Sequence, residues 1–339
     1  MRPLTALVLL GSLSLTTLFL AACGSSSSAP AASGSAGAAG AGGTGTGGAT
    51  SAGGANAAGA AGSGGEAGAG EGLGDYDPTP IGGTRPTLVY VPTGYRASHP
   101  APVVILLHGY GVSGLIQEAL FQVAKQAETA GFLYAHPDGL VDASGKHFWN
   151  ATDACCDFGP KGVDDSAYLA GLVTEIASRW SVDPKRVYFI GHSNGGYMAH
   201  RMACDHADTI AAVMSLAGAM WADTSKCKPA APISVLQIHG TIDDMVAYDG
   251  TATYPSAKKT VEDWAAFDGC SLTPDTSLPP LDLDESIPGD ESTITKYAAG
   301  CKGNADVELW TIPGGMHVPG LSKTFLPDVV GFLLAHPKP

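Results

Sequence analysis

Basic residues are scarce in this sequence. The 339 residues include 18 Lys and Arg against 32 Asp and Glu, which gives a formal net charge of −14. Such a chain has no electrostatic attraction to nucleic acid or to an anionic membrane surface, so neither is expected as a partner. The sequence also lacks a Gly-rich phosphate loop and a dinucleotide-binding fingerprint, and we expect no cofactor. Beyond residue 20 it contains no apolar run long enough to span a membrane.

The first 22 residues have the features of an export signal. Arg2 gives a short cationic start, residues 7–20 are largely apolar, and small residues precede Cys23. The apolar stretch is shorter than a membrane span, as in a signal peptide. Small residues before a cysteine are typical of bacterial lipoproteins, in which that cysteine is lipidated. We expect an exported protein that is anchored through Cys23 at the cell surface or at the periplasmic face of a membrane. Release into the medium is the other expected location. An ordinary secretory signal is the alternative.

Residues 24–74 consist almost entirely of Gly, Ala, Ser and Thr. A segment with so few large apolar side chains cannot bury enough surface to offset the entropy lost on ordering it. We expect the lipidated cysteine and this segment, residues 23–75, to form a flexible tether with a mean reach of roughly 40 Å. The remainder, residues 76–339, is long enough for one sizeable domain, which we expect to be monomeric.

Residues 191–195, Gly-His-Ser-Asn-Gly, place a serine between an apolar strand at 187–190 and a helical pattern at 197–204. A turn this tight strains the backbone of Ser193 and lifts its hydroxyl above the sheet edge, and the glycines let strand and helix pass closely. The start of the helix also offers free N–H groups to developing negative charge. An ordinary strand–turn–helix connection is the alternative, but the flanking elements favour Ser193 as a nucleophile.

A catalytic base for Ser193 must lie further along the chain if the order is Ser, acid, His. His317 follows a strand at 307–312, inside a Gly-rich loop that can carry an imidazole over the sheet edge. The other downstream histidines fit less well. They lie on or after helices, or at the end of a strand with no acid-bearing strand between it and Ser193: His200, His206, His239 and His336. We therefore predict His317 as the base.

The acid that orients His317 should follow the preceding strand. The β-rich run at 233–238 continues into His-Gly-Thr-Ile-Asp-Asp at 239–244. A carboxylate here would accept the far N–H of His317 and stabilise the imidazolium that forms during catalysis. Asp243 and Asp244 are adjacent, and the residues alone do not separate them.

The run at 103–107 is continuously apolar, as expected for a strand buried on both faces, and leads into His-Gly-Tyr-Gly at 108–111. Main-chain N–H groups of Gly109 or Tyr110 would join that of Asn194 to form an oxyanion hole. We expect His108 to be structural. Three aromatic residues are candidate substrate contacts, although each could equally belong to the core: Tyr110, Trp149 and Tyr197.

Strands and helices alternate along the rest of the chain. Expected strands cover 87–91, 103–107, 132–135, 187–190, 211–216, 233–238 and 307–312, and expected helices cover 115–130, 167–180, 197–204 and 325–334. The alternation favours an α/β fold with a mostly parallel sheet and helices on both faces. The candidate residues then fall at the carboxyl ends of the strands. In the helix at 115–130 we expect one buried face: Leu115, Ala119, Leu120, Val123 and Ala127.

Six cysteines remain besides Cys23, and an even number in an exported domain indicates three disulfides. Cys270 and Cys301 flank a polar, acidic stretch at 271–300, so we expect them to pair. The other bonds would then join the adjacent cysteines to the remaining two, in either order: Cys155 and Cys156 with Cys204 and Cys227. His200, Cys204 and His206 superficially offer metal ligands, but we expect a disulfide there and no metal.

These motifs together resemble a known family. His-Gly at 108–109, Gly-His-Ser-Asn-Gly-Gly at 191–196, His-Gly-Thr-Ile-Asp at 239–243 and Gly-Met-His-Val-Pro-Gly at 315–320 are similar to those of bacterial polyhydroxybutyrate-depolymerase-like and feruloyl-esterase-like lipoproteins. The likeness covers about residues 85–335, including Cys-Cys at 155–156. It implies an α/β-hydrolase acting on carboxylic esters, with Ser193, Asp243 and His317 as its triad, and so favours Asp243 over Asp244.

The resemblance implies a serine esterase that acts through an acyl-enzyme. The expected substrates are feruloyl or acetyl esters of plant polysaccharide, polymeric or polymer-derived. A polyhydroxyalkanoate depolymerase is the alternative, and a non-catalytic lipoprotein that binds surface polymers is the second. The family often has a tryptophan after the catalytic histidine, where this chain has Val318. If that tryptophan packs on an aromatic acyl or sugar group, this enzyme should have a different preference.

Overall fold

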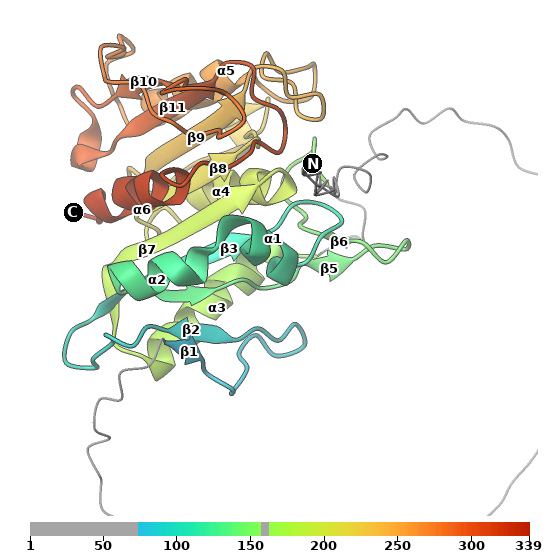
Figure 1. The fold of residues 1–339 in the computed structure, drawn as a ribbon, viewed down its shortest axis with the longest axis vertical. Helices are drawn as coiled ribbons and strands as arrows, with labels where there is room; N and C mark the ends of the chain where they lie inside the picture. Colours follow the sequence, from blue (N-terminus) through green and yellow to red (C-terminus); the bar gives the residue numbers. More distant parts are fainter. Residues whose placement is uncertain (1–73, 157–162) are drawn as a thin grey trace, which may run out of the picture. The chain divides into compact units, whose positions relative to one another are not determined.

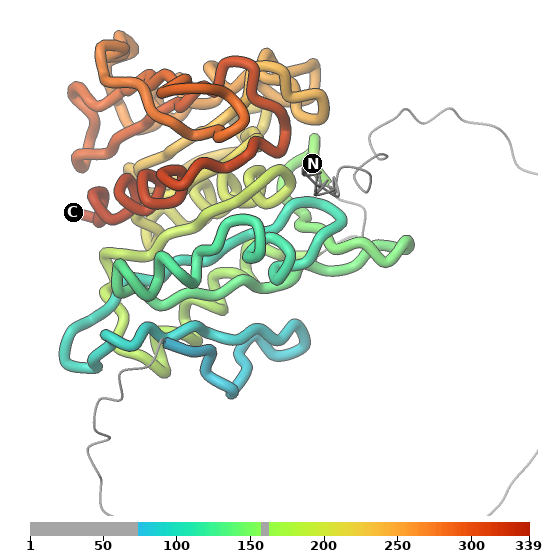
Figure 2. Tube along the Cα trace, viewed as in Figure 1, coloured from blue at the N-terminus to red at the C-terminus, as the bar shows by residue number. Residues whose placement is uncertain are grey.

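A nine-stranded sheet runs through the computed structural model, which describes residues 74–156 and 163–339 (Figure 1). Six neighbouring strands are parallel, in the order Leu133–Ala135 (β4), Ala101–Leu107 (β3), Val182–His192 (β7), Ala212–Leu216 (β8), Ser234–Gly240 (β9) and Val307–Ile312 (β11). Antiparallel strands complete both edges: Val89–Val91 (β2) and Asp75–Tyr76 (β1) beside β4, and Thr293–Tyr297 (β10) beside β11. The chain therefore crosses the sheet from its first described residues at one edge to its last third at the other (Figure 2).

Helices cover both faces of this sheet. Buried side chains of one face pack with Asp165–Arg179 (α3), Asn194–Asp205 (α4) and Ala257–Phe267 (α5). Those of the other face pack with Gly114–Phe121 (α1), Val123–Ala130 (α2) and Phe325–Ala335 (α6). Alternate residues of β3 serve the two cores, Val103 and Ile105 on one face and Val104 and Leu106 on the other. A strand buried on both faces needs an apolar residue at every position, which explains the continuous run.

Smaller elements connect the main ones. A two-stranded hairpin, Leu140–Val141 (β5) with His147–Phe148 (β6), follows β4. Short 3₁₀ turns occur at Thr224–Lys226 and Lys302–Asn304. None of the helices in the described ranges combines the length and apolar character that crossing a membrane requires. The expected signal, Cys23 and almost all of the expected tether lie outside the described residues.

The single helix expected over residues 115–130 is wrong. Gln122 adopts left-handed backbone angles, φ 56° and ψ 41°, and separates α1 from α2. The break rotates the buried face of α1 to Gly114, Gln117 and Phe121. Leu115 and Leu120, which we expected in the core, are exposed by 67% and 40%.

The disulfides correct the expected pairing. Cys270 bonds to Cys301, as expected, and so closes the stretch that contains β10. Cys155 and Cys156 bond to each other rather than to separate partners. Cys204, in α4, bonds to Cys227, because the loop after β8 brings Cys227 against the buried end of that helix. The sulfur of Cys204 is therefore not available as a metal ligand.

Candidate active site

The turn from β7 to α4 holds Ser193 at the carboxyl edge of the sheet. Its φ of 54° and ψ of −120° are strained for a residue with a side chain. The neighbouring glycines are required by close backbone contact: a Cβ on Gly191 would overlap the Gly195 carbonyl, and one on Gly195 would overlap the Leu107 carbonyl. The Ser193 N–H donates to the carbonyl of Leu216 at 2.8 Å, which fixes the turn against β8.

Three of the predicted residues meet at this edge. Ser193 Oγ lies 2.9 Å from His317 Nε2, and His317 Nδ1 lies 2.8 Å from Asp243 Oδ2. They come from the ends of β7, β11 and β9, which lie within four consecutive strands of the sheet. Asp243 and His317 are buried, whereas Asp244 is exposed. The geometry therefore selects Asp243 of the two adjacent carboxylates.

Asp243 is surrounded by hydrogen-bond donors. Burial raises its pKa, but hydrogen bonds from His239 and His317 outweigh that effect and hold the pKa well below its usual range. The N–H groups of Met245 and Val246 also donate to Oδ1, at 2.9 and 2.8 Å. Asp243 is thus a fixed anion beside the imidazole of His317, able to hold one tautomer of that ring and to stabilise its protonated form.

His192 supports His317 and was missed from the sequence. Its Nε2 donates to the His317 carbonyl at 3.1 Å, and the two ring centroids lie 5.1 Å apart. Desolvation, followed by the proximity of His317, lowers the pKa of His192 to about 3, so the ring stays neutral. The sequence did contain a signal for this role, namely the position of His192 directly before Ser193. A residue at the end of β7 must lie next to the loops that follow the neighbouring strands.

The oxyanion loop after β3 is held by buried polar contacts. The Gly109 N–H donates to Gln117 Oε1 at 3.1 Å, so it is already used within the protein. This corrects the expectation that Gly109 could supply an oxyanion donor. The N–H of Asn194 is the first of α4, where no intrahelical acceptor exists. Asn194 and Tyr110 remain the candidate donors.

Trp149 supports this loop and does not face an open site. Its indole Nε1 donates to the His108 carbonyl at 3.1 Å, and its ring packs against that of His108 with centroids 4.9 Å apart. The side chain of Asn194 in turn bonds both the N–H and the carbonyl of Trp149, at 2.7 and 2.9 Å. Its Nδ2 also lies 3.5 Å from Cys155 Sγ, so the Cys155–Cys156 disulfide abuts the residue after the serine.

The candidate aromatic substrate contacts are therefore reduced to one. Trp149 and Tyr197 are fully buried, because one packs under the oxyanion loop and the other in the core beneath α4. Tyr110 is partly exposed, and its hydroxyl donates to Asp142 Oδ2 at 2.6 Å.

Asp165 holds the segment next to Trp149. It is fully buried, forms an ion pair with Arg85 and accepts the Asn150 N–H at 2.7 Å. Asp164 caps α3 by accepting the N–H of Ala167 at 2.9 Å. Asp164 thus caps the helix, whereas Asp165 positions the segment next to Trp149.

Among the residues that the structure describes, one group of side chains has ligand atoms close enough for a metal ion. His108, Asp138 and His147 place such atoms within 4.8 Å of one another. However, His108 Nδ1 bonds the Gly109 carbonyl at 2.8 Å, and Nε2 accepts the Gly139 N–H at 2.9 Å. Burial also lowers the pKa of His108 to about 4, so the ring is neutral. Both ring nitrogens of His108 are thus used within the protein, in agreement with a structural role for this residue.

A family model described as phospholipase/carboxylesterase matches residues 95–264, which include the oxyanion loop, the serine turn and Asp243. The chain belongs to this family. Feruloyl esterase B of Piromyces equi is 33% identical over 251 residues, which are 70% of this chain and 44% of that protein. This carboxylesterase-family chain therefore spans less than half the length of that relative. A putative esterase of Nocardia uniformis subsp. tsuyamanensis is 30% identical over 246 residues, 68% of this chain and 69% of the relative.

Solved structures agree on the fold. An acetyl xylan esterase from Aspergillus awamori superposes with a TM-score of 0.53 at 18% identity, over 77% of this chain and 100% of the other. A thermostable esterase gives the same TM-score at 15% identity, over 78% of this chain and 64% of the other. The expected α/β-hydrolase fold and the resemblance to feruloyl esterases are both confirmed.

Proposed function

We propose that this protein is an exported serine esterase that hydrolyses feruloyl or acetyl esters of plant polysaccharide through an acyl-enzyme. The observation that carries the mechanism is the continuous hydrogen-bonded chain from Ser193 through His317 to a buried, ionised Asp243. The substrate class is supported by the relatives, which include a feruloyl esterase and a bifunctional acetylxylan esterase/xylanase of Neocallimastix patriciarum.

The first half of the reaction forms the acyl-enzyme. Ser193 Oγ attacks the ester carbonyl carbon while its proton passes to His317 Nε2. The N–H groups of Tyr110 and Asn194 stabilise the oxyanion of the tetrahedral intermediate. The intermediate collapses, the bond to the alcohol oxygen breaks, and the alcohol leaves with the proton from Nε2.

The second half returns the enzyme to its starting state. Water attacks the acyl carbon and gives a proton to His317 Nε2. The resulting tetrahedral intermediate expels Ser193 Oγ, which takes that proton back, and the carboxylic acid is released. Asp243 stays ionised throughout and stabilises the imidazolium in both halves.

A polyester is the second candidate substrate, because the loops that carry Asp243 and His317 expose large apolar side chains. Ile242, Met245, Met316 and Val318 are exposed by 59%, 47%, 55% and 40%. Apolar side chains beside the reacting groups suit an aliphatic chain without sugar hydroxyls. Polyhydroxyalkanoate therefore remains the runner-up.

The substrate class is tested by comparing methyl ferulate, acetylated xylan and hydroxybutyrate oligomers as substrates of the full chain. We expect kcat/KM for one of the first two to exceed that for the oligomers by at least about tenfold, a discrimination of about 1.4 kcal/mol. The Ser193→Ala variant should hydrolyse none of them. The reverse preference would make the protein a polyester depolymerase. A folded wild type that binds polymer but cleaves no ester would indicate the non-catalytic alternative.

A further inference from the structure

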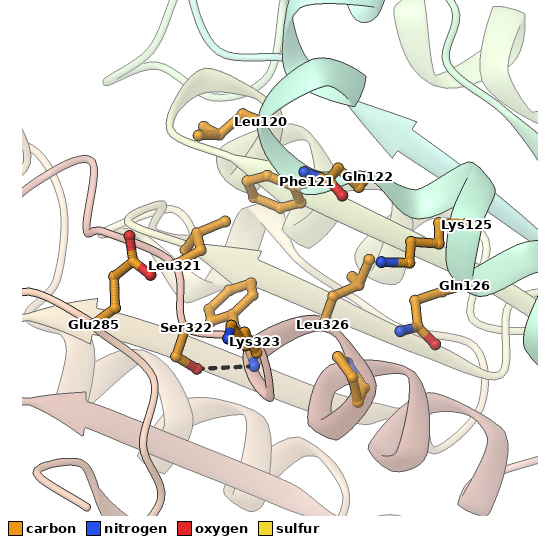
Figure 3. Close-up of a pocket in the computed structure, with 12 residues that line it drawn as sticks. Leu120, Phe121, Gln122, Lys125, Gln126, Glu285, Leu321, Ser322, Lys323 and Leu326 are labelled. Carbon is orange, nitrogen blue, oxygen red and sulfur yellow. Dashed lines mark hydrogen bonds between the residues drawn. The ribbon is translucent and has the colours of Figure 1, made fainter. Parts of the chain in front are cut away.

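A cavity that is lined by none of the triad residues lies near the candidate active site. A cavity of about 360 Å³ opens between the break at Gln122 and the start of α6 (Figure 3). Lys125 and Gln126, from α2, form one wall, and Leu321 and Glu285 lie on the opposite side. Its volume falls within the range of small-molecule sites.

Residues in the walls of the cavity are linked to His317. Phe121 lines it, and the Phe121 ring lies 6.2 Å from that of His192, which bonds the His317 carbonyl. On the far wall the chain that leaves His317 continues directly into Ser322 and Lys323. A ligand held in this cavity would therefore contact Phe121, which packs on His192, and the continuation of the His317 loop.

The cavity carries charges of both signs. Neither Lys125 nor Lys323, both exposed, has a carboxylate within salt-bridge distance among the described residues. Glu285 likewise has no cationic partner there. Two unpaired ammonium groups in one concavity favour a ligand with a carboxylate, and Glu285 opposes it.

Gln122 adds polar groups at a backbone position that costs free energy. A left-handed residue with a side chain is less favourable by roughly 1 kcal/mol, a cost that glycine avoids. Its side chain lines the cavity together with that of Gln126, so two amides offer both donors and acceptors. Such groups match sugar hydroxyls, and the apolar side chains of Leu120 and Leu326 match the C–H faces of a sugar ring.

We propose that this cavity binds the polysaccharide chain that carries the ester, at a segment bearing a uronic acid. The inference rests on the proposed function of the adjacent site. Lys125 and Lys323 hold the uronate carboxylate, Gln122 and Gln126 bond hydroxyls, and the ester-bearing sugar reaches Ser193 along the His317 loop.

The test measures binding without turnover. The full chain carrying Ser193→Ala is titrated by calorimetry with two ester-free xylo-oligosaccharides of equal length, one bearing a glucuronic acid and one unsubstituted. We expect the acidic ligand to bind more tightly, by about three- to tenfold, and its affinity to fall with added salt. Equal affinity for the two ligands would overturn the proposal.

Variants assign the effect to this cavity. In the same background, Lys125→Gln and Lys323→Gln should each lower affinity for the acidic ligand about three- to fivefold. Glu285→Gln should raise it about two- to threefold, because a repulsive charge is lost. Gln122→Gly should keep or raise the melting temperature while weakening the binding of both ligands.

The matched control is Lys258→Gln, the same charge change on the exposed face of α5, which should leave affinity unchanged. The proposal fails if Lys258→Gln lowers affinity for the acidic ligand as the cavity variants do, or if the cavity variants leave that affinity unchanged.

Failure of the proposed function is distinguishable from failure of this subsite. Hydrolysis of methyl ferulate and 4-nitrophenyl acetate by the wild type tests the ester chemistry alone, since neither substrate carries a sugar. An active esterase with no preference for the acidic oligosaccharide would overturn only the subsite. A protein inactive on all esters that still shows the charge-dependent binding would overturn only the esterase.

Discussion

At the residue scale, each member of the candidate triad is held by a different local device. Ser193 is fixed by a strained turn between two glycines, and His317 by the hydrogen bond from neutral His192. Asp243 is fixed by main-chain N–H groups of the loop that follows it. Because the three triad residues follow different strands, β7, β9 and β11, the alignment of the triad depends on the register of the sheet.

Replacing the acid separates Asp243 from its neighbour. Asp243→Asn keeps the size of the side chain but removes the charge that fixes the His317 tautomer, so kcat should fall by about 10³–10⁴. Asp244→Asn changes an exposed side chain and should stay within about twofold of wild type. The measurement is steady-state hydrolysis of methyl ferulate, with thermal melts to show that both variants fold. A larger loss in Asp244→Asn would reassign the acid.

The sequence was sufficient to identify site residues where the chemistry and the order of residues along the chain constrain the choice. Strand ends and loop glycines singled out Ser193 and His317, whereas choosing Asp243 over Asp244 needed the family resemblance. The burial of Trp149 was not predictable, because it depends on packing against His108 and Asn194, which lie about 40 residues away on either side. Residue type alone does not say whether an aromatic ring faces a ligand or the core.

At the element scale, the buried parallel strands were the most predictable part of the fold. Each is a short, continuous apolar run, and the expected positions of β3, β8, β9 and β11 agree with the structure within a few residues. β10 was missed because an edge strand with one open side carries polar residues, here Thr-Ile-Thr-Lys-Tyr. The break at Gln122 was missed because neither Gly nor Pro marks it.

The end of α5 contains a carboxyl that should make stability depend on pH. Asp268 is buried, and its Oδ2 has no hydrogen-bond partner among the described residues. Burial raises its pKa to about 7, although the Ile233 N–H, Lys302 and Lys338 act in the opposite direction. An unfolded aspartate titrates near pH 4, so between about pH 4 and 7 only the folded state keeps the proton. The free energy of unfolding contributed by Asp268 therefore falls as pH rises through this window.

Asp268→Asn should remove this dependence. The free energy of unfolding of the variant minus that of wild type should be larger at about pH 8 than at about pH 4.5. The increase should be about 2–4 kcal/mol, the order expected for a shift of about three pKa units. Urea unfolding of both proteins at the two pH values measures the difference. Comparing the same pair at each pH cancels the packing cost of the amide. Unfolding curves that shift equally for both proteins would show that Asp268 ionises normally.

At the scale of the whole molecule, we propose that the folded domain works at the end of a lipid-anchored tether. Lipidation needs the Cys23 thiol, and each buried methylene of an acyl chain contributes about 0.8 kcal/mol to membrane binding. A chain with a net charge of −14 has no electrostatic reason to stay at an anionic membrane without that anchor.

Cys23→Ser should therefore abolish labelling by a fatty-acid probe and remove the protein from the detergent-extractable membrane fraction. The protein should be soluble, or retain its uncleaved signal. Ester hydrolysis per folded molecule should not change, because the domain carries the reacting groups. Wild type that is fully soluble and begins at a residue other than Cys23 would rule out the anchor.

Covalent capture of the nucleophile tests the central claim most directly. The full chain is treated with a fluorophosphonate, which reacts with an activated serine, and the adduct is located by intact mass and peptide mapping. We predict one equivalent on Ser193, none in Ser193→Ala, and labelling at least about 100-fold slower in His317→Ala, because the serine loses its base. An active wild type that is modified at another residue, or a folded Ser193→Ala variant that still hydrolyses esters, would contradict the account.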